Sequence, residues 1–340
     1  MKYRINLISD TVTKPTPAML NAMLSADLGD DVFKEDPTVA ALESKMAAMF
    51  SKEAGLFCPS GTMTNQIAIK AHTVPMDEMI CETHSHVFQY EVGGYAFHSG
   101  IAVNPISGIN GKLNVSLVEG QIKAPMDWLP RTRLVVIENT CNRAGGQFYT
   151  ENELRELSDF CKKNDLVFHC DGARVFNALL ESHINSQDYG GYFDSISICL
   201  SKGLGAPVGS VLVGTNEMIQ RARRIRKVMG GGMRQAGIIA AAGIYALDHH
   251  IERLAIDHSH AKRIEIALKK CSFVKEIIPV QSNIVIFALK DHISPDEFIE
   301  ILHQHDIHAS AFGKNLVRFV THLDIHEKMV EKVCFLLESI

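Results

Sequence analysis

Short apolar runs alternate with amphipathic segments along the middle of the chain. The apolar runs, each with the length of a buried strand, lie at residues 79–81, 134–138, 166–170, 195–200 and 210–213. The amphipathic segments, which have helical spacing, include residues 61–71, 151–163 and 217–228. This alternation predicts an α/β protein with a mainly parallel sheet whose faces are covered by helices.

The two ends of the chain depart from this pattern. The first 35 residues are polar and irregular apart from a predicted short helix at residues 18–25, and Asp36 followed by Pro37 predicts the start of the next helix. After predicted helices at 235–247 and 252–269, two strand-like runs remain at 283–289 and 315–321, with helices at 294–305 and 326–338. We therefore expect an N-terminal segment (1–30), a large domain (31–249) and a smaller α+β domain (250–340).

Composition and charge narrow the class of partner. The 340 residues are 46% hydrophobic and 21% charged, as is usual for a globular protein. A net charge of −5 does not indicate a basic surface, so neither nucleic acid nor an anionic membrane is an expected partner. No apolar run reaches membrane-spanning length and no signal-peptide pattern opens the chain, so a cytoplasmic location is expected.

The cysteines and histidines do not predict a metal site. None of the eight cysteines forms a C-x-x-C pair, which favours small core residues in a reducing compartment. Several of the 16 histidines cluster near the C-terminus, but His258 and His260 are two residues apart and cannot share a helix face.

Lys202 stands directly after the predicted strand at 195–200, between a serine and a glycine. A lysine held at a strand end by small residues can lose part of its hydration and act as an amine nucleophile. The alternative is an ordinary turn lysine.

Two further groups follow predicted strands or open helices. Gly61 and Thr62 would present backbone N–H groups at a helix N-terminus, where a phosphate dianion binds well, unless this is only a capped helix start. His84 or His86 would reach a ligand from the segment after the run at 79–81, the alternative being a loop histidine.

Asp171 directly follows the run at 166–170, and Arg174 lies three residues further along. A buried carboxylate is costly unless it meets a cation, so Asp171 either pairs with Arg174 or faces a protonated heterocyclic nitrogen. In the second case Arg174 would turn to another part of the same ligand. Arg318, within the apolar run 316–320, suits a bidentate contact with a carboxylate, unless it faces water on an edge strand.

Three consecutive glycines at 230–232 lie between Lys227 and Arg234, an arrangement that suits either anion binding or a mobile loop. The candidates together offer hydrogen-bond donors for a phosphate, an aspartate for a ring nitrogen, an amine for an aldehyde and an arginine for a substrate carboxylate. These are the needs of a pyridoxal-phosphate enzyme that acts on amino acids.

Over nearly its whole length the chain resembles the low-specificity L-threonine aldolases of the beta-eliminating lyase family, which are fold-type I (aspartate-aminotransferase-like) pyridoxal-phosphate enzymes. The motifs that carry the resemblance are SDTVTKPT (9–16), GDDV (29–32), PSGTM (59–63), DGAR (171–174), SKGL (201–204) and GGGMRQAG (230–237). The resemblance implies retro-aldol cleavage of L-threonine or L-allo-threonine to glycine and acetaldehyde. It also implies a homo-oligomer, a dimer of dimers, with active sites at the dimer interface.

The resemblance further implies a role for each candidate residue. Lys202 would hold the cofactor as a Schiff base, and Asp171 would keep the ring nitrogen protonated. His86 would stack on the ring and is the candidate general base, while Arg174 would contact the phenolic oxygen. The expected phosphate contacts are Gly61 and Thr62, joined by Lys227 and Arg234 of a neighbouring subunit, and the expected substrate-carboxylate contacts are Ser9 and Arg318.

Three positions depart from the family pattern. Trp128 and Cys141 stand where the family commonly has histidines, and Phe33 replaces a usual tyrosine. We expect the loss of histidine to loosen discrimination between the threo and erythro substrates. A beta-eliminating lyase, an amino-acid racemase or a non-catalytic protein on the same scaffold are the alternatives.

Overall fold

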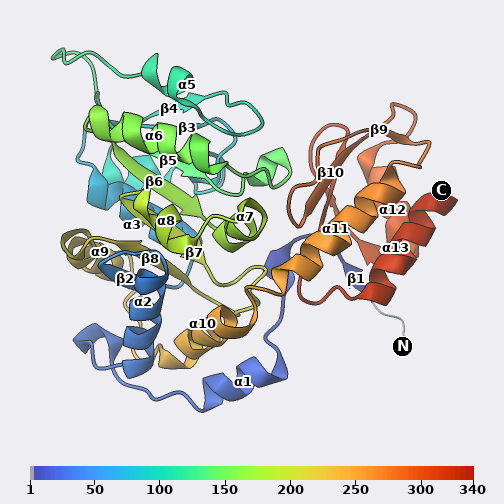
Figure 1. The fold of residues 1–340 in the computed structure, drawn as a ribbon, viewed down its shortest axis with the longest axis horizontal. Helices are drawn as coiled ribbons and strands as arrows, with labels where there is room; N and C mark the ends of the chain where they lie inside the picture. Colours follow the sequence, from blue (N-terminus) through green and yellow to red (C-terminus); the bar gives the residue numbers. More distant parts are fainter. Residues whose placement is uncertain (1–3) are drawn as a thin grey trace.

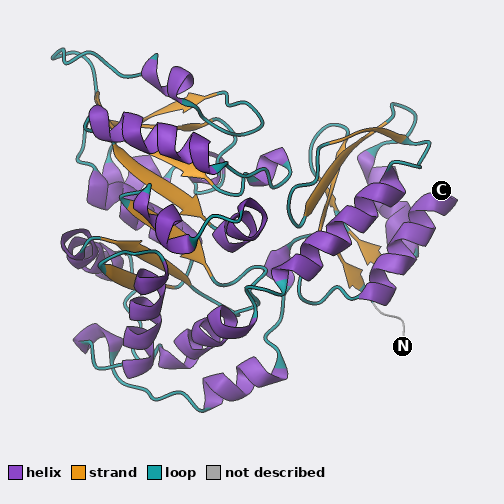
Figure 2. Cartoon of the chain, viewed as in Figure 1, coloured by secondary structure: helices purple, strands orange, loops and turns teal. Residues whose placement is uncertain are grey.

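The computed structural model describes residues 4–340, and within that range seven strands form the central sheet of the larger part of the molecule (Figures 1 and 2). Their order across the sheet is β2 (Ala54–Cys58), β8 (Ser210–Gly214), β7 (Ser195–Cys199), β6 (Val167–Gly172), β5 (Arg131–Glu138), β3 (Asp77–Glu82) and β4 (Ala102–Ile106). Strand β8 is antiparallel to both neighbours, and the other adjacent pairs are parallel. The predicted mainly parallel α/β sheet is confirmed.

Helices cover both faces of this sheet, because alternate side chains of each buried strand point to opposite sides. Helices α3 (Gly61–His72) and α9 (Asn216–Val228) pack on one face, against residues such as Leu56 and Leu212. Helices α2 (Pro37–Met49), α6 (Glu151–Lys163) and α10 (Gly237–His249) pack on the other, where Phe168 and Ile196 point.

The C-terminal part contains a second sheet, with the order β12 (Ser310–Ala311), β13 (Leu316–Val320), β10 (Ile284–Leu289) and β9 (Val274–Ile277), all antiparallel. Its helices are α11 (Leu254–Leu268), α12 (Pro295–Gln304) and α13 (Glu327–Ser339). Strand β1 (Ile5–Asn6) pairs in parallel with β11 (Ile307–His308), so the start of the chain joins this part (Figure 1).

Shorter helices connect these elements: α1 (Pro17–Leu24), α4 (His86–Gln89), α5 (Val115–Glu119), α7 (Val175–Ser182) and α8 (Ser186–Gly191). Asp36 caps α2 as predicted, since its Oδ1 accepts a hydrogen bond from the backbone N–H of Val39 at 2.9 Å. None of the described helices has both the length and the apolarity to cross a bilayer.

Candidate active site

A pocket of about 550 Å³ lies at the carboxyl ends of β5, β6 and β7 and is closed on one side by β12 and β13. Open α/β sheets bind ligands at this edge. The predicted residues that line it are Ser9, Gly61, Thr62, His86, Asp171, Arg174, Lys202 and Arg318. The structure therefore brings together the predicted site residues other than Lys227 and Arg234.

A network of hydrogen bonds holds the buried Asp171 carboxylate. Its Oδ1 accepts from the backbone N–H of Ala173 at 3.2 Å, and its Oδ2 accepts from Nδ2 of Asn65 at 3.0 Å. The same Nδ2 donates to Oε1 of Glu91 at 2.9 Å, and that oxygen lies 3.0 Å from Nδ1 of His86. Asp171, Asn65, Glu91 and His86 thus form one connected group.

The contact with Glu91 determines what His86 can do. Burial by itself would lower the pKa of the imidazole, but the hydrogen bond to Glu91 and the charge of Asp171 outweigh it, and the pKa is raised. When His86 is neutral, Nδ1 carries the proton that is donated to Glu91, and Nε2 keeps a free lone pair. That state is suited to a general base.

His86, Glu91 and Asp171 offer ligand atoms that lie within 4.8 Å of one another. Asn65, however, points its amide N–H groups at both carboxylates. Such donors take up the lone pairs that a cation would need, so the trio fits a hydrogen-bonded network better than a metal cage.

Arg174 pairs with Asp10, not with Asp171. Its Nε and Nη2 donate to the two carboxylate oxygens of Asp10, each at 2.7 Å, and both side chains are buried. Burial alone would raise the pKa of Asp10, but the Arg174 guanidinium lowers it well below its usual value. Among the described residues no arginine pairs with Asp171, which leaves its carboxylate available for a protonated ring nitrogen.

Arg318 keeps donor capacity inside the pocket. Its Nη1 donates to Oδ1 of Asn142 and its Nη2 to the backbone oxygen of Ile8, each at 3.0 Å, while its buried Nε has no hydrogen-bond partner among the described residues. Burial and the charge of Arg174 lower its pKa to about 10, so it remains a cation near neutral pH. A carboxylate could be received here.

The N-terminus of α3 faces the same pocket. Ser60 caps the helix by accepting from the backbone N–H of Met63 at 3.2 Å, which leaves the first-turn N–H groups of Gly61 and Thr62 without intrahelical acceptors. A Cβ at Gly61 would lie 2.5 Å from Sγ of Cys199, so only glycine permits this close approach of helix and strand.

These groups fit pyridoxal phosphate. The α3 N-terminus offers donors for a phosphate, Asp171 offers a carboxylate for the ring nitrogen, and the unpartnered Nε of Arg318 suits a substrate carboxylate. Lys202, directly after β7, brings a primary amine to the same pocket, and its backbone oxygen is held by Oγ1 of Thr13 at 2.9 Å.

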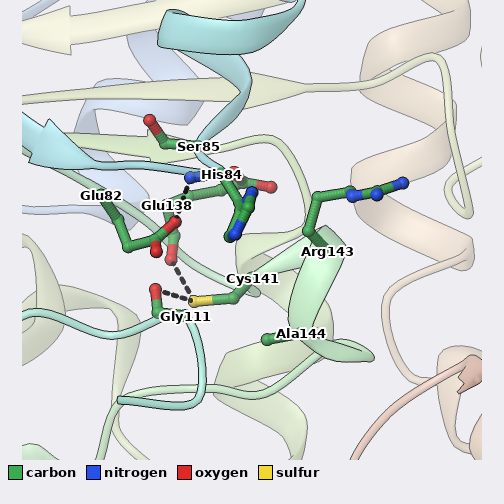
Figure 3. Close-up of a pocket in the computed structure, with 8 residues that line it drawn as sticks. All are labelled: Glu82, His84, Ser85, Gly111, Glu138, Cys141, Arg143 and Ala144. Atoms are coloured by element: carbon green, nitrogen blue, oxygen red, sulfur yellow. Dashed lines mark hydrogen bonds between the residues drawn. The ribbon is translucent and has the colours of Figure 1, made fainter. Parts of the chain in front are cut away.

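A smaller cavity of about 180 Å³ adjoins this pocket and shares Glu138 and Arg143 with it (Figure 3). His84 lines this cavity, whereas His86 lines the main pocket. Cys141 lies at the cavity wall, where its Sγ is 3.1 Å from the backbone oxygen of Glu138 and 3.2 Å from that of Gly111, and its single S–H can donate to either (Figure 3). Burial, and then the charge of Asp171, raise the pKa of Glu138.

The remaining predicted residues lie elsewhere. Arg234 pairs with Asp30 at 2.7 Å and lies over the ring of Phe33, and Lys227 lines a separate basic pocket. Trp128 is 77% exposed and lines neither the main pocket nor the side cavity among the described residues.

Asp10, Asn65 and Glu91 are site residues that the sequence analysis did not identify. Asn65 carries a local signal, since it is a polar residue on the apolar face of a predicted helix. Asp10 begins a short 3-10 helix and Glu91 lies in a loop, and only the tertiary fold shows that both are buried, at 0% and 3% exposure.

Comparison with known proteins gives one consistent result. A profile of the family described as beta-eliminating lyase matches residues 6–291. The chain is 39% identical to the low specificity L-threonine aldolase of Escherichia coli K12 over 97% of both chains. It is 38% identical to the low-specificity L-threonine aldolase of Candida albicans over 96% of this chain and 87% of that one.

A similar fold occurs in the solved structure of Leishmania major threonine aldolase, with a TM-score of 0.85 and 22% identity over 98% of this chain and 99% of that one.

Proposed function

Since this chain belongs to the beta-eliminating lyase family, we propose that it is a pyridoxal-phosphate-dependent carbon–carbon lyase that cleaves L-threonine and L-allo-threonine to glycine and acetaldehyde. The observation that carries the proposal is the convergence of Lys202, Asp171, His86 and Arg318 on one pocket at the α3 N-terminus. When bound, the cofactor supplies an aldehyde for amines and a ring that accepts the electron pair of a broken bond at Cα.

The protein's own groups select the bond that breaks. Arg318 and Ser9 hold the substrate carboxylate, which fixes the rotation about the bond between Cα and the amine nitrogen. With the carboxylate held in this way, the substrate would present its Cα–Cβ bond for cleavage, because positioning selects the bond that reacts. Asp171 would hold the proton of the ring nitrogen, and Lys202 would provide the amine that holds the cofactor between turnovers.

His86 takes up the proton of the β-hydroxyl as the Cα–Cβ bond breaks and the aldehyde leaves. Its Nδ1–H is held by Glu91, so the free Nε2 receives the proton. Protonation of Cα then completes glycine. We assign Arg174, paired with Asp10, to the phenolic oxygen of the ring.

A spectrum and a product assay test the proposal. Purified protein supplied with pyridoxal phosphate is expected to gain a visible band, and a coupled assay is expected to detect acetaldehyde from L-threonine. Lys202→Ala should lose both, because no other primary amine lines the pocket among the described residues. A β-elimination or racemisation would release no acetaldehyde, and a protein that stays colourless would refute the cofactor assignment.

The two isomers of threonine test the substrate range. The side cavity holds Cys141 where the family commonly has histidine, and the exposed Trp128 lines neither cavity among the described residues. We therefore expect similar rates of cleavage for L-threonine and L-allo-threonine, because a less polar wall does not fix one orientation of the hydroxyl. A strong preference for either isomer would contradict this expectation.

We further propose a homo-oligomer, a dimer of dimers, in which Lys227 and Arg234 reach the phosphate of a neighbouring subunit. Their position away from the subunit's own pocket supports this assignment. We propose that the chain divides into an N-terminal segment, a large domain and a small domain at residues 30 and 249. A cytoplasmic location is proposed because the eight cysteines are all free.

A further inference from the structure

A row of buried polar side chains begins at the pocket, which Asn65 and Asp171 line, and continues through the interface between α3 and the sheet. His169 and Asp171 are two residues apart on β6, so their side chains point to the same face of the sheet. Ser195 lies beside His169 in the neighbouring strand. Asn65 and His72 are seven residues apart on α3, so they share the helix face that packs on these strands. Asn65, His169 and Ser195 are at most 1% exposed.

The hydrogen bonds in this row are continuous. His72 Nε2 lies 2.8 Å from Oγ of Ser195, which lies 2.8 Å from Nδ1 of His169. His169 Nε2 lies 3.3 Å from Oδ1 of Asn65. Asn65 Nδ2 then donates to Asp171 and Glu91.

The carboxylates of Asp171 and Glu91, at the pocket end of the row, determine which atom is the donor in each hydrogen bond of the row. Because Asn65 must direct Nδ2 at two carboxylates, its Oδ1 faces His169 and requires a donor there. Burial, and then the neighbouring His72, lower the pKa of His169 to about 3, so its ring carries a single proton. That proton is on Nε2, and Nδ1 must accept from the hydroxyl of Ser195.

The hydroxyl of Ser195 has only one proton, which it gives to His169. It must therefore accept from Nε2–H of His72, whose pKa burial lowers to about 4. All donors in the row point toward the pocket. An amide does not readily pass a proton from its nitrogen to its oxygen, so the row orients groups and does not conduct protons.

Given the cofactor assigned above, we propose that Asn65 is a positioning residue for the Asp171 carboxylate and that Ser195 and His72 act through it by fixing the tautomer of His169. Without the Ser195 hydroxyl, His169 can move its proton to Nδ1 and donate to the backbone oxygen of Ser195, 3.1 Å away. The lone pair of Nε2 would then face the oxygen of Asn65. The amide would turn, and Asp171 and Glu91 would lose their shared donor.

Strand β7 offers a matched control. Ser197 is also fully buried and also bonds to α3, through Oγ1 of Thr64 at 2.6 Å. Among the described residues, the side chains of this pair make no hydrogen bond with the row. Ser195→Ala and Ser197→Ala therefore remove the same group from the same strand. Only the first removes a member of the row.

The experiment compares Ser195→Ala, Ser197→Ala and Asn65→Ala as holoenzymes, by the dissociation constant for pyridoxal phosphate, the visible spectrum at one fixed pH and the melting temperature. Loss of a hydrogen bond to a charged group is expected to weaken cofactor binding about tenfold or more in Asn65→Ala and in Ser195→Ala, with an altered visible band. Ser197→Ala should lower the melting temperature about as much as Ser195→Ala, yet keep the wild-type spectrum and affinity.

The possible outcomes separate the two proposals. A wild-type protein that forms no visible band with the cofactor would refute the proposed function itself. The wild type could form the band while Ser195→Ala matches Ser197→Ala in affinity and spectrum. That result would refute the proposed role of the row, even if Asn65→Ala bound the cofactor weakly.

Discussion

Asp10 and Arg174 form a buried ion pair, in which Arg174 lines the pocket and Asp10 lies behind it. The side chain of Asp10 is fully buried and that of Arg174 is 6% exposed, so neither charge is well hydrated. Removing one partner of a buried pair typically costs about 3–5 kcal/mol, because the other charge is left uncompensated. The pair also ties the N-terminal segment to the large sheet.

Asp10→Asn is expected to lower the free energy of unfolding by about 3 kcal/mol or more at pH 7. The pKa of Asp10 is lower in the folded state than in the unfolded state, so its contribution is fully present above about pH 4 and is lost as the pH falls through the folded pKa. The difference between wild type and variant should therefore shrink in acid. Urea unfolding at several pH values measures it.

The exposed Asp159 of α6 provides the control for this experiment. Asp159→Asn should change the free energy of unfolding much less than Asp10→Asn does, because a charge at the surface contributes little. The difference in the free energy of unfolding between wild type and Asp10→Asn could instead stay constant down to the lowest pH at which the protein folds. That result would contradict the lowered pKa of Asp10 in the folded state.

Among the elements, periodicity predicted most of the central strands and helices but missed strands β2 and β4. Helix α6 has the predicted bounds, because Thr150 and Glu153 form a capping box before a clear apolar stripe. Strand β4, with Asn104, Pro105 and a largely exposed surface, carries no such pattern. The serines of β7 and the histidine of β6 were visible as polar residues in apolar runs, but their hydrogen-bond partners on α3 were not.

Contact between helix α3 and strand β7 sets the position of the backbone N–H groups that are predicted to bind the phosphate. Gly61→Ala would place a methyl group 2.5 Å from Sγ of Cys199 and push the helix start away from the strand. Affinity for pyridoxal phosphate should fall about tenfold, because the first-turn N–H groups move with the helix. Equilibrium titration followed by absorbance measures this change.

Two further variants test the cause. Gly61→Ala combined with Cys199→Ala should recover most of the affinity, because the clashing sulfur is gone. Gly191→Ala, where a new Cβ would meet nothing within 4 Å, should bind the cofactor as the wild type does. Failure of the double variant to recover would show that the glycine matters for another reason.

At the scale of the molecule, the pocket combines segments that are far apart in the sequence. Ser9, Asp171 and Arg318 come from the start, middle and end of the chain. The sequence predicted each of these residues as a site residue by itself, from its position near a strand or from the family resemblance. The pairing of Arg174 with Asp10 could not be predicted, because it depends on how the N-terminal segment crosses the sheet.

A shared active site predicts complementation between subunits. If Arg234 acts on the neighbouring site, a dimer of one Lys202→Ala and one Arg234→Ala subunit has one doubly defective site and one intact site. Equal co-expression should then give roughly a quarter of the wild-type sites, while each variant alone is inactive or strongly impaired. Acetaldehyde release and the visible band both count intact sites.

Asp171 supplies the control, because it lines the same pocket as Lys202 within one subunit. Every site of a dimer between Lys202→Ala and Asp171→Asn subunits keeps one defect, so no recovery is expected. Recovery in the first mixture alone would assign Arg234 to the partner's site. If neither mixture recovered, Arg234 would act within its own subunit, and its ion pair with Asp30 would have to break for it to reach the cofactor.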